Sequence, residues 1–156
     1  MAFTEVNGAK LWYEVTGEGE PVVHIHGAGF GHFNFATATP IESKYFQCVD
    51  YDQRGYGQSD KPIQNYDMEV WADDLAGLMD HLGLETAHVH GSSMGGMVAQ
   101  EFAVDHQDRL KSLTLSATSP AFGRPDGDFQ KRFVEARLAP LAGGATMADL
   151  ATELVE

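Results

Sequence analysis

The sequence predicts an α/β fold built on a doubly wound, mostly parallel sheet, and two features of the chain support this prediction. Short runs of β-branched and aromatic residues alternate with longer segments that carry helical patterns. Glycine-rich loops follow some of these runs directly, as at residues 26–29 and 91–96. Strands joined by such crossover segments pair in parallel and place their helices on the faces of the sheet.

The first half of the chain is dominated by strand patterns. Asn7-Gly8 lies between two strand-like runs and suits the type I′ turn of a β-hairpin. Val22, Val23 and Ile25 lie in a run that is typical of a buried strand. We therefore assign strands to residues 3–6, 10–15, 22–25 and 46–51 and a helix to residues 36–44.

The second half carries the clearest helix pattern. This helix begins at Asp67, which is suited to capping, repeats apolar residues on one face and ends at Gly83. We assign strands to residues 87–90 and 113–117 and further helices to residues 94–104, 129–138 and 147–155, the last of them capped by Thr146.

The composition changes after Pro120. Residues 123–127 read as a linker, because they combine glycine, proline and charged residues, and no strand pattern follows them. We expect residues 1–120 to form the sheet domain and residues 121–156 to form a separate helical part.

An acidic charge balance narrows the classes of function. The 156 residues include 10 Lys and Arg against 23 Asp and Glu, a formal charge of −13. The scattered basic residues form no patch for phosphates, so we expect no nucleic-acid partner and no membrane partner. The printed sequence shows neither a leader pattern nor an apolar stretch of spanning length, so a cytoplasmic location is the expectation.

Cys48 is the single cysteine, and we expect it to be inert packing.

The segment Gly91-Ser92-Ser93-Met94-Gly95 matches the pattern Gly-x-Ser-x-Gly between an expected strand and an expected helix. This context is typical of a nucleophile elbow, in which Ser93 projects from the carboxyl edge of the sheet. Gly91 and Gly95 are required because a Cβ would clash in so sharp a turn. The Met94 N–H opens the helix and would stabilise an oxyanion at the same point. The alternative is a Gly/Ser-rich turn without a catalytic role.

A second amide donor is expected in the loop His26-Gly27-Ala28-Gly29, which follows another central strand. The Ala28 N–H is the candidate for the other half of the oxyanion hole, with Gly29 as the alternative. The same glycines would also suit a tight turn alone.

A third motif, Asp52-Gln53-Arg54-Gly55-Tyr56-Gly57-Gln58-Ser59, lies between these two loops. With the three motifs in this order, the chain resembles the α/β-hydrolase family over residues 3–120. The resemblance implies the sheet of that family, truncated after the sixth strand, with residues 121–156 as the beginning of a helical cap. We expect Asp52 and Arg54 to hold their turn by hydrogen bonds. The motif residues to which we assign structural roles are His26, Gly27, Asp52, Arg54, Gly55, Gly57, Gly91 and Gly95.

Within the family, residues 93–100 and the cap-like residues 131–141 look most similar to 3-oxoadipate enol-lactonase-like hydrolases. Ser93 separates the chain from haloalkane dehalogenases and epoxide hydrolases, which attack with a carboxylate at the elbow. The resemblance implies acyl transfer to water through an acyl-enzyme. A small-molecule carboxylic ester or lactone is the expected substrate, and the C–C bond of an activated diketone is the alternative.

A serine nucleophile needs a histidine and an orienting acid, which in this fold follow it along the chain. Only His106 follows Ser93, and a helix with a rise of about 1.5 Å per residue places it about 20 Å away. Glu101 and Asp105 lie on the same helix. His32 lies at the correct edge, but its loop is oriented for an oxyanion role. The resemblance implies an acid and a histidine on later strands.

Neither a metal nor a cofactor is expected. His24, His26, His88 and His90 form two i, i+2 pairs on neighbouring strands, but we interpret them as satisfied polar residues rather than as ligands. The glycine loops lack the spacing of a dinucleotide site and the lysine of a phosphate-binding loop.

A sheet that ends at residues 113–117 has an open edge and an uncovered apolar face. We expect a C-terminal half, another chain or a homodimer mate to complete it. Two hypotheses follow. The chain belongs to a serine hydrolase that depends on such a segment, or it is a catalytically silent half-domain that binds a ligand or assembles with another chain.

Overall fold

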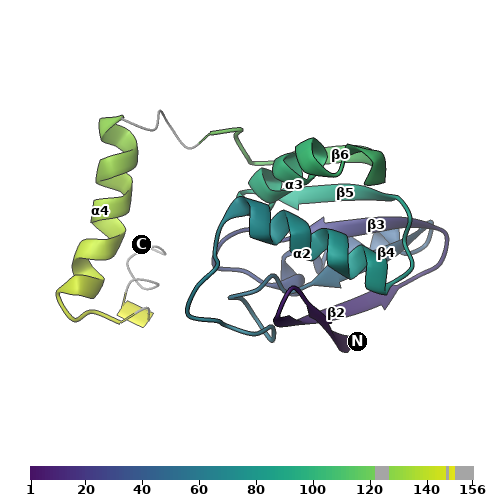
Figure 1. Cartoon of the computed structure of the whole chain (residues 1–156), viewed down its shortest axis with the longest axis horizontal. Coiled ribbons are helices and arrows are strands. Elements are labelled where there is room, and N and C mark those ends of the chain that lie inside the picture. Colours follow the sequence, from purple (N-terminus) through teal and green to yellow (C-terminus); the bar gives the residue numbers. More distant parts are fainter. Residues whose placement is uncertain (122–126, 147, 150–156) are drawn as a thin grey trace. The chain divides into compact units, whose positions relative to one another are not determined.

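The computed structural model describes residues 1–121, 127–146 and 148–149. The chain divides into two compact units, Met1–Pro120 and Ala121–Glu156. The first unit holds the sheet, and the second holds the helix α4 (Asp128–Ala142), as labelled in Figure 1. Among the described helices, none is long and apolar enough to cross a membrane.

A six-stranded sheet forms the centre of the first unit, with the order β1-β2-β4-β3-β5-β6. β3 pairs in parallel with β4 and β5, and β5 with β6, whereas β2 pairs antiparallel with β1 and β4. The carboxyl ends of the parallel strands therefore meet at one edge, where α/β folds place their sites. The strands are β1 (Ala2–Val6), β2 (Ala9–Thr16), β3 (Glu20–Ile25), β4 (Phe46–Tyr51), β5 (Ala87–Ser92) and β6 (Leu110–Ser116).

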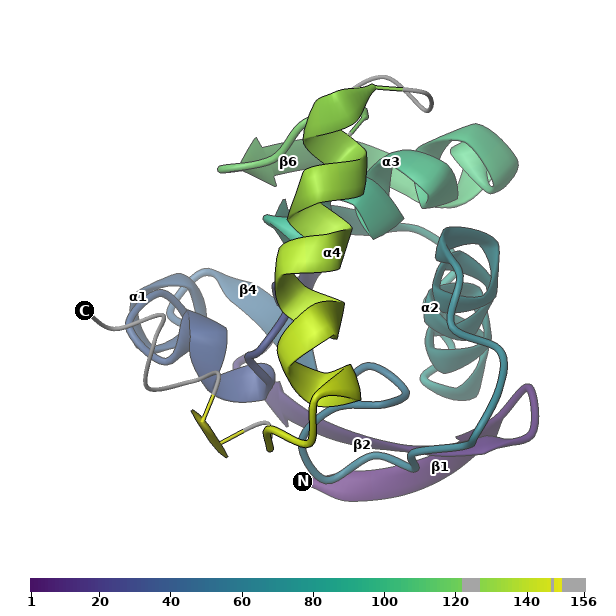
Figure 2. The same ribbon diagram turned by 90° about the vertical axis from the view of Figure 1, so that its left-hand side faces the viewer.

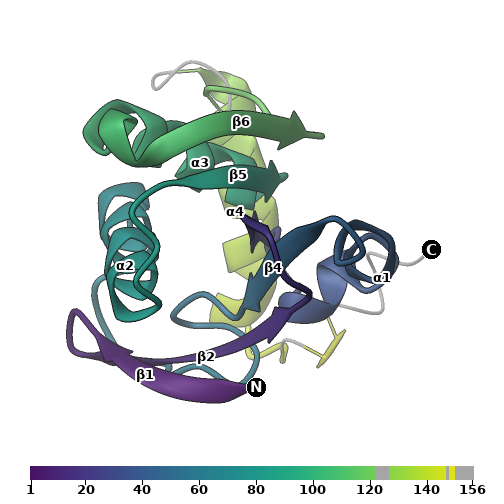
Figure 3. The ribbon, with the colours of Figure 1, turned by 90° about the vertical axis from the view of Figure 1, so that its right-hand side faces the viewer.

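Helices lie on both faces of this sheet. Figures 2 and 3 show α1 on one side and α2 on the other. α3 packs against α2 and β5, so it lies on the α2 side. The doubly wound, mostly parallel arrangement expected from the sequence is confirmed. The helices are α1 (Thr39–Glu42), α2 (Met68–His81) and α3 (Met94–Asp105), with 3₁₀ turns at His32–Phe35 and Gln107–Arg109.

The main core lies between the sheet and the helices α2 and α3. Val23 and Val89 on the central strands are buried there with Leu75 of α2 and Phe102 of α3. Because side chains alternate along a strand, the residues directly before and after these valines face the other side of the sheet, where α1 lies. One of those neighbours is the buried His24.

Two local predictions are confirmed by backbone geometry. Asn7 and Gly8 have φ angles of 47° and 74°, as a type I′ turn between β1 and β2 requires. Asp67 caps α2, since its Oδ1 accepts a hydrogen bond of 2.8 Å from the Val70 N–H. Gly83 ends this helix region with a φ of 67°.

Two other elements differ from the prediction. In place of a helix over residues 36–44, a 3₁₀ turn precedes the short α1, where Pro40 occupies the first turn. The last strand begins at Leu110 rather than at residue 113, and Ala117 ends it with a φ of 49°. The start of this strand was not predicted because Lys111 and Ser112 are polar and do not fit the apolar pattern of a strand. A strand at the edge of a sheet carries such exposed polar side chains.

In the second unit, α4 extends the helix expected at residues 129–138. Beyond it, the Thr146 N–H donates to the Asp149 carboxylate at 2.8 Å, and the Asp149 N–H donates to Thr146 Oγ1 at 3.3 Å. This reciprocal pair is a capping box, and it agrees with the expectation that Thr146 caps a helix. The rest of the helix expected at residues 147–155 lies outside the described residues.

Candidate active site

Ser93 occupies the sharp turn between β5 and α3. Its φ and ψ are 53° and −119°, a backbone conformation that a residue with a Cβ adopts at an energetic cost. Two hydrogen bonds hold the turn, from the Ser93 N–H to the Ser116 carbonyl at 2.9 Å and from the Gly96 N–H to the Ser93 carbonyl at 3.0 Å. The exposed side chain therefore stands on a strained, fixed backbone at the carboxyl end of a central strand.

The glycines around Ser93 are required by close backbone contacts. A Cβ on Gly91 would press on the Gly95 carbonyl, and a Cβ on Gly95 would press on the Ile25 carbonyl at the end of β3. A Cβ on Gly96 would lie 2.6 Å from the Thr118 side chain. These positions let α3 start directly against the ends of β3 and β6.

The loop after β3 approaches the same point. A Cβ on Gly27 would lie 3.1 Å from Ser93 Cβ and 3.7 Å from Ser93 Oγ. Ala28 and Gly29 continue this loop and are exposed, and Gly29 has a φ of 78°. The Met94 N–H, in the first turn of α3, has no partner within the helix. The loop that carries Ala28 and Gly29 therefore begins beside Ser93, at the start of α3.

His26 fixes the conformation of that loop. Its buried ring has Nδ1 at 2.9 Å from the Gly27 carbonyl, and Nε2 accepts a hydrogen bond of 3.1 Å from the Gln53 N–H. Burial lowers the pKa of His26, although the bond to the Gly27 carbonyl acts in the opposite direction. A neutral ring with its proton on Nδ1 satisfies both contacts. Both ring nitrogens of His26 are therefore used in hydrogen bonds to the backbone of Gly27 and Gln53.

Asp52 organises the turn after β4. Its carboxylate accepts hydrogen bonds from the His32 N–H at 2.6 Å, from His32 Nδ1 at 3.0 Å and from the Gln58 N–H at 2.8 Å. Burial alone would raise the pKa of Asp52, but these hydrogen bonds lower it overall. A Cβ on Gly57 or Gly31 would collide with this carboxylate, so both loops close tightly around it.

Arg54 connects three segments of the first unit. Its guanidinium makes two hydrogen bonds to the Asp74 carboxylate of α2, at 2.5 and 2.6 Å, and one to the Asn7 carbonyl at 3.1 Å. The bonds to Asp74 raise the pKa of Arg54. Because both partners are buried, this pair ties the β4 loop to α2 and to the hairpin turn.

The histidines available in the described residues do not contact Ser93. His32 is bonded to Asp52, and its ring stacks on Trp12 of β2 at a centroid distance of 4.0 Å. Two strands, β4 and β3, separate β2 from the strand that carries Ser93. His106 lies at the opposite end of α3 and bonds Asp73 of α2 at 3.0 Å. In the part of the chain that the structure describes, Ser93 Oγ has no hydrogen-bonded base.

The four histidines of β3 and β5 separate into different environments. His26 belongs to the loop described above, and His88 bonds Ser112 and Glu20 on an exposed part of the sheet. Only His24 and His90 come together, with ring centroids 5.8 Å apart. Burial lowers the pKa of His90, with a further lowering from His24 and an opposing effect of Glu42.

Several residues of this region were not singled out from the sequence. Asn34 accepts the Gly27 N–H at 3.2 Å, and the Gln53 side chain donates to the His26 carbonyl at 2.8 Å. Tyr56 packs edge-on against His26 and donates to Met94 Sδ at 3.5 Å. Gln53 and Tyr56 lie within a motif that the sequence did reveal, whereas Asn34 carries no local pattern that would mark it.

Comparison with known proteins identifies the family. A model of the α/β hydrolase fold matches residues 20–146. The chain belongs to the α/β-hydrolase family. Its serine lies where this family places its nucleophile, at the strand-to-helix elbow after a central strand.

The relatives of this α/β-hydrolase differ in chemistry. The AB hydrolase superfamily protein YisY of Bacillus subtilis is 37% identical over 75% of this chain and 45% of its own length. A soluble epoxide hydrolase of a Corynebacterium strain is 31% identical over 80% of this chain and 43% of its own length. The enol-lactonase of Burkholderia xenovorans superposes with a TM-score of 0.85 at 31% identity, covering 99% of this chain and 58% of that one. The chain thus spans about half the length of the curated relatives it matches.

Proposed function

We propose that this α/β-hydrolase chain carries the nucleophile half of a serine hydrolase that cleaves a carboxylic ester or lactone. The conformation of Ser93 supports the proposal most directly, because a strained serine between β5 and α3 is what nucleophilic attack at this edge requires. The similarity to an enol-lactonase over nearly the whole chain agrees with a lactone or ester as substrate.

In the proposed reaction, Ser93 Oγ attacks the carbonyl carbon and loses its proton to a histidine. The Met94 amide, with that of Ala28 or Gly29, donates hydrogen bonds to the oxyanion that forms. The intermediate collapses as the histidine returns its proton to the leaving oxygen, which departs as the alcohol, and water then hydrolyses the acyl-enzyme. We assign the histidine and its orienting acid to a C-terminal segment or a partner chain that completes the sheet beyond β6.

Residues 121–156 are proposed to begin a helical cap. Such a cap would line the acyl pocket and exclude water during the reaction. The same architecture would also accept an activated diketone, whose C–C bond is cleaved by an equivalent attack on a carbonyl carbon. Comparing hydrolysis of a simple ester, a lactone and a vinylogous diketone by the completed enzyme would separate these substrate classes.

Covalent labelling tests the role of Ser93. The chain, alone and together with a C-terminal half from a relative, is treated with a fluorophosphonate and its intact mass is measured. One adduct is expected in the completed assembly, absent in Ser93→Ala and retained in Ser92→Ala, which removes the neighbouring hydroxyl. An adduct that persists in Ser93→Ala, or that disappears in Ser92→Ala, would refute the assignment.

A catalytically silent half-domain is the second candidate. It is favoured by one observation, that no histidine in the described residues bonds Ser93 Oγ. This alternative predicts ligand binding without labelling, even when a C-terminal half is present and circular dichroism shows a folded chain.

A further inference from the structure

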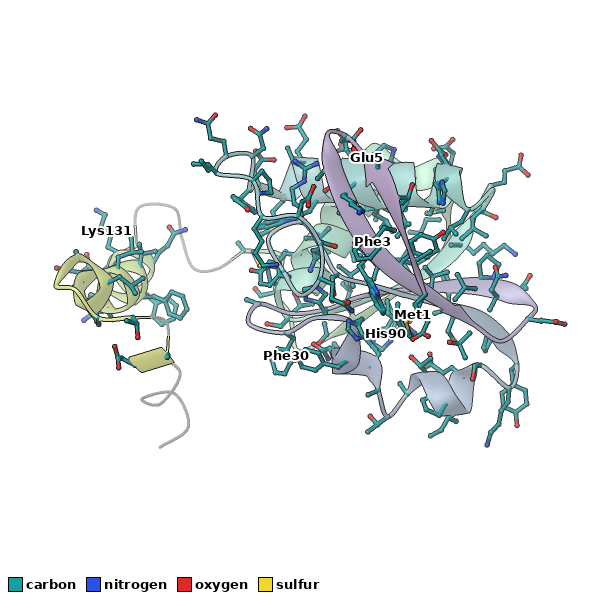
Figure 4. All side chains as sticks on the ribbon, turned by 90° about the horizontal axis from the view of Figure 1, so that it is seen from below. Met1, Phe3, Glu5, Phe30, His90 and Lys131 are labelled. Atoms are coloured by element: carbon teal, nitrogen blue, oxygen red, sulfur yellow. The ribbon has the colours of Figure 1, made fainter. Side chains whose placement is uncertain are left out.

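A second group of polar side chains lies on the α1 side of the sheet. His24 of β3 and His90 of β5 are register partners on adjacent parallel strands, so their side chains share one face. Glu42, at the end of α1, reaches the same place. One ligand atom from each of these three residues lies within 4.8 Å of the others. His90 is labelled in Figure 4.

His24 is held in one orientation by neighbours on both sides of its ring. Its Nδ1 lies 2.8 Å from Asp50 Oδ1, and Asp50 Oδ2 accepts the Thr39 hydroxyl at 2.9 Å. The opposite ring nitrogen, Nε2, lies 2.8 Å from Glu42 Oε2. A carboxylate behind a histidine in this way fixes the tautomer and ring direction of histidines that bind metals.

His90 is held in a comparable manner. Its Nε2 lies 2.8 Å from Ser116 Oγ, which orients the ring. The buried Phe35 stacks on His24 at 4.4 Å and meets His90 edge-on at 4.9 Å. The two imidazoles are therefore positioned before any ligand arrives, which reduces the entropic cost of binding one.

From this arrangement we propose that His24, His90 and Glu42 form a binding site for a divalent transition-metal ion of the zinc class. Two imidazoles and one carboxylate suit Zn²⁺ and its neighbours and are a poor match for Mg²⁺ or Ca²⁺, which prefer oxygen ligands. The cation would take the place of the contact between His24 Nε2 and Glu42 Oε2, and water would fill the remaining position. The proposal departs from the sequence-based expectation of no metal, because Glu42 could not be placed beside the histidines without the fold.

The distances allow such a site after small movements. Zinc bonds of about 2.0–2.1 Å in a tetrahedron place ligand atoms about 3.3 Å apart. The His24–Glu42 separation of 2.8 Å would open slightly, and the separations from His90, which lie within 4.8 Å, would close by up to about 1.5 Å. The Glu42 side chain is 33% exposed, which leaves it room to move towards the ion.

A cation would also have a route to these residues. Glu42 and His90 line a surface cavity of about 270 Å³, together with Phe46 and Thr114, while His24 lies buried beneath them. His90 lies within β5 on the α1 face of the sheet, whereas Ser93 follows the end of that strand in the turn to α3. A bound ion would link α1 to the central strands β3 and β5, from which its ligands come.

The test uses the whole 156-residue chain, freed of metal with a chelator. Zn²⁺ affinity is measured by competition with a chromophoric chelator, and Co²⁺ is added to record its visible spectrum. Wild type should bind one equivalent, with the Co²⁺ absorption of a site that contains nitrogen ligands. Glu42→Gln and His90→Gln should each weaken binding at least about tenfold, since even the loss of a supporting residue costs that much.

His88→Gln is the matched control. His88 lies on the same strand and face, also beside a carboxylate, but outside the cluster. Its loss should leave the affinity unchanged. Binding by wild type no tighter than by His90→Gln, or a loss in His88→Gln as large as in His90→Gln, would overturn the proposal. Circular dichroism of each variant verifies folding, and Glu42→Gln changes only a partly exposed side chain.

Discussion

Gly95 shows how closely the elbow around Ser93 is packed at the scale of single residues. Gly95→Ala would place a methyl group against the Ile25 and His26 carbonyls, which belong to the backbone and cannot turn aside. We expect a loss of about 1–3 kcal/mol in the free energy of unfolding, measured by urea denaturation. Gly83→Ala is the comparison, because its Cβ meets open space and only its positive φ is strained. Stabilisation by Gly95→Ala, as in an ordinary helix, would contradict the close approach of α3 to β3.

Asp52 gives a prediction about pH at the same scale. Its folded-state pKa lies below the ordinary value of 3.8, so its ionised form stabilises the fold above that pH. This contribution is lost as the pH falls through the lowered folded value. Asp52→Asn should cost about 1–3 kcal/mol at pH 7, because charged hydrogen bonds are removed. The difference in the free energy of unfolding between wild type and Asp52→Asn, measured by urea denaturation, should become smaller as the pH falls below 3.8. A difference that does not change with pH would contradict the prediction.

At the scale of elements, the Arg54–Asp74 pair holds the β4 loop, α2 and the hairpin together. Arg54→Met leaves the Asp74 carboxylate buried without its partner, which should cost about 3–5 kcal/mol. Replacing both residues, as in Arg54→Met with Asp74→Leu, should recover much of that loss because no unpaired charge remains. Denaturation of the single and double variants measures the difference. Equal losses in the two would mean that the unpaired charge of Asp74 is not what destabilises the single variant.

At the scale of the whole molecule, β6 pairs with β5 alone among the described strands. Leu115 on this strand is 42% exposed. We expect the isolated chain to associate as its concentration rises, because unpaired strand edges template pairing with other chains. Leu115→Lys should shift association to higher concentration in light scattering, whereas Ile63→Lys, in an exposed loop, should not. A chain that stays monomeric throughout the range would contradict this expectation.

Much of the first unit could be predicted because its signals are local. The turn Asn7-Gly8, the cap Asp67 and the elbow around Ser93 depend on neighbouring residues, and the structure shows each of the expected backbone geometries. The elements around residues 36–44 and 110–112 were misplaced. In the first, a proline lies in the first turn of the short helix. In the second, the strand lies at the edge of the sheet, and its exposed polar residues do not show the apolar pattern of a strand.

The sequence by itself indicated the family, most of the succession of strands and helices along the chain, and the serine that is the candidate nucleophile, because each rests on short motifs and periodic patterns. Only the tertiary structure decided which distant residues meet. It joined Arg54 to Asp74, turned His32 towards Asp52 and Trp12, and gathered His24, His90 and Glu42 on one face. These contacts depend on strand register and on the crossing of loops over the sheet, which long-range packing fixes and no local pattern records.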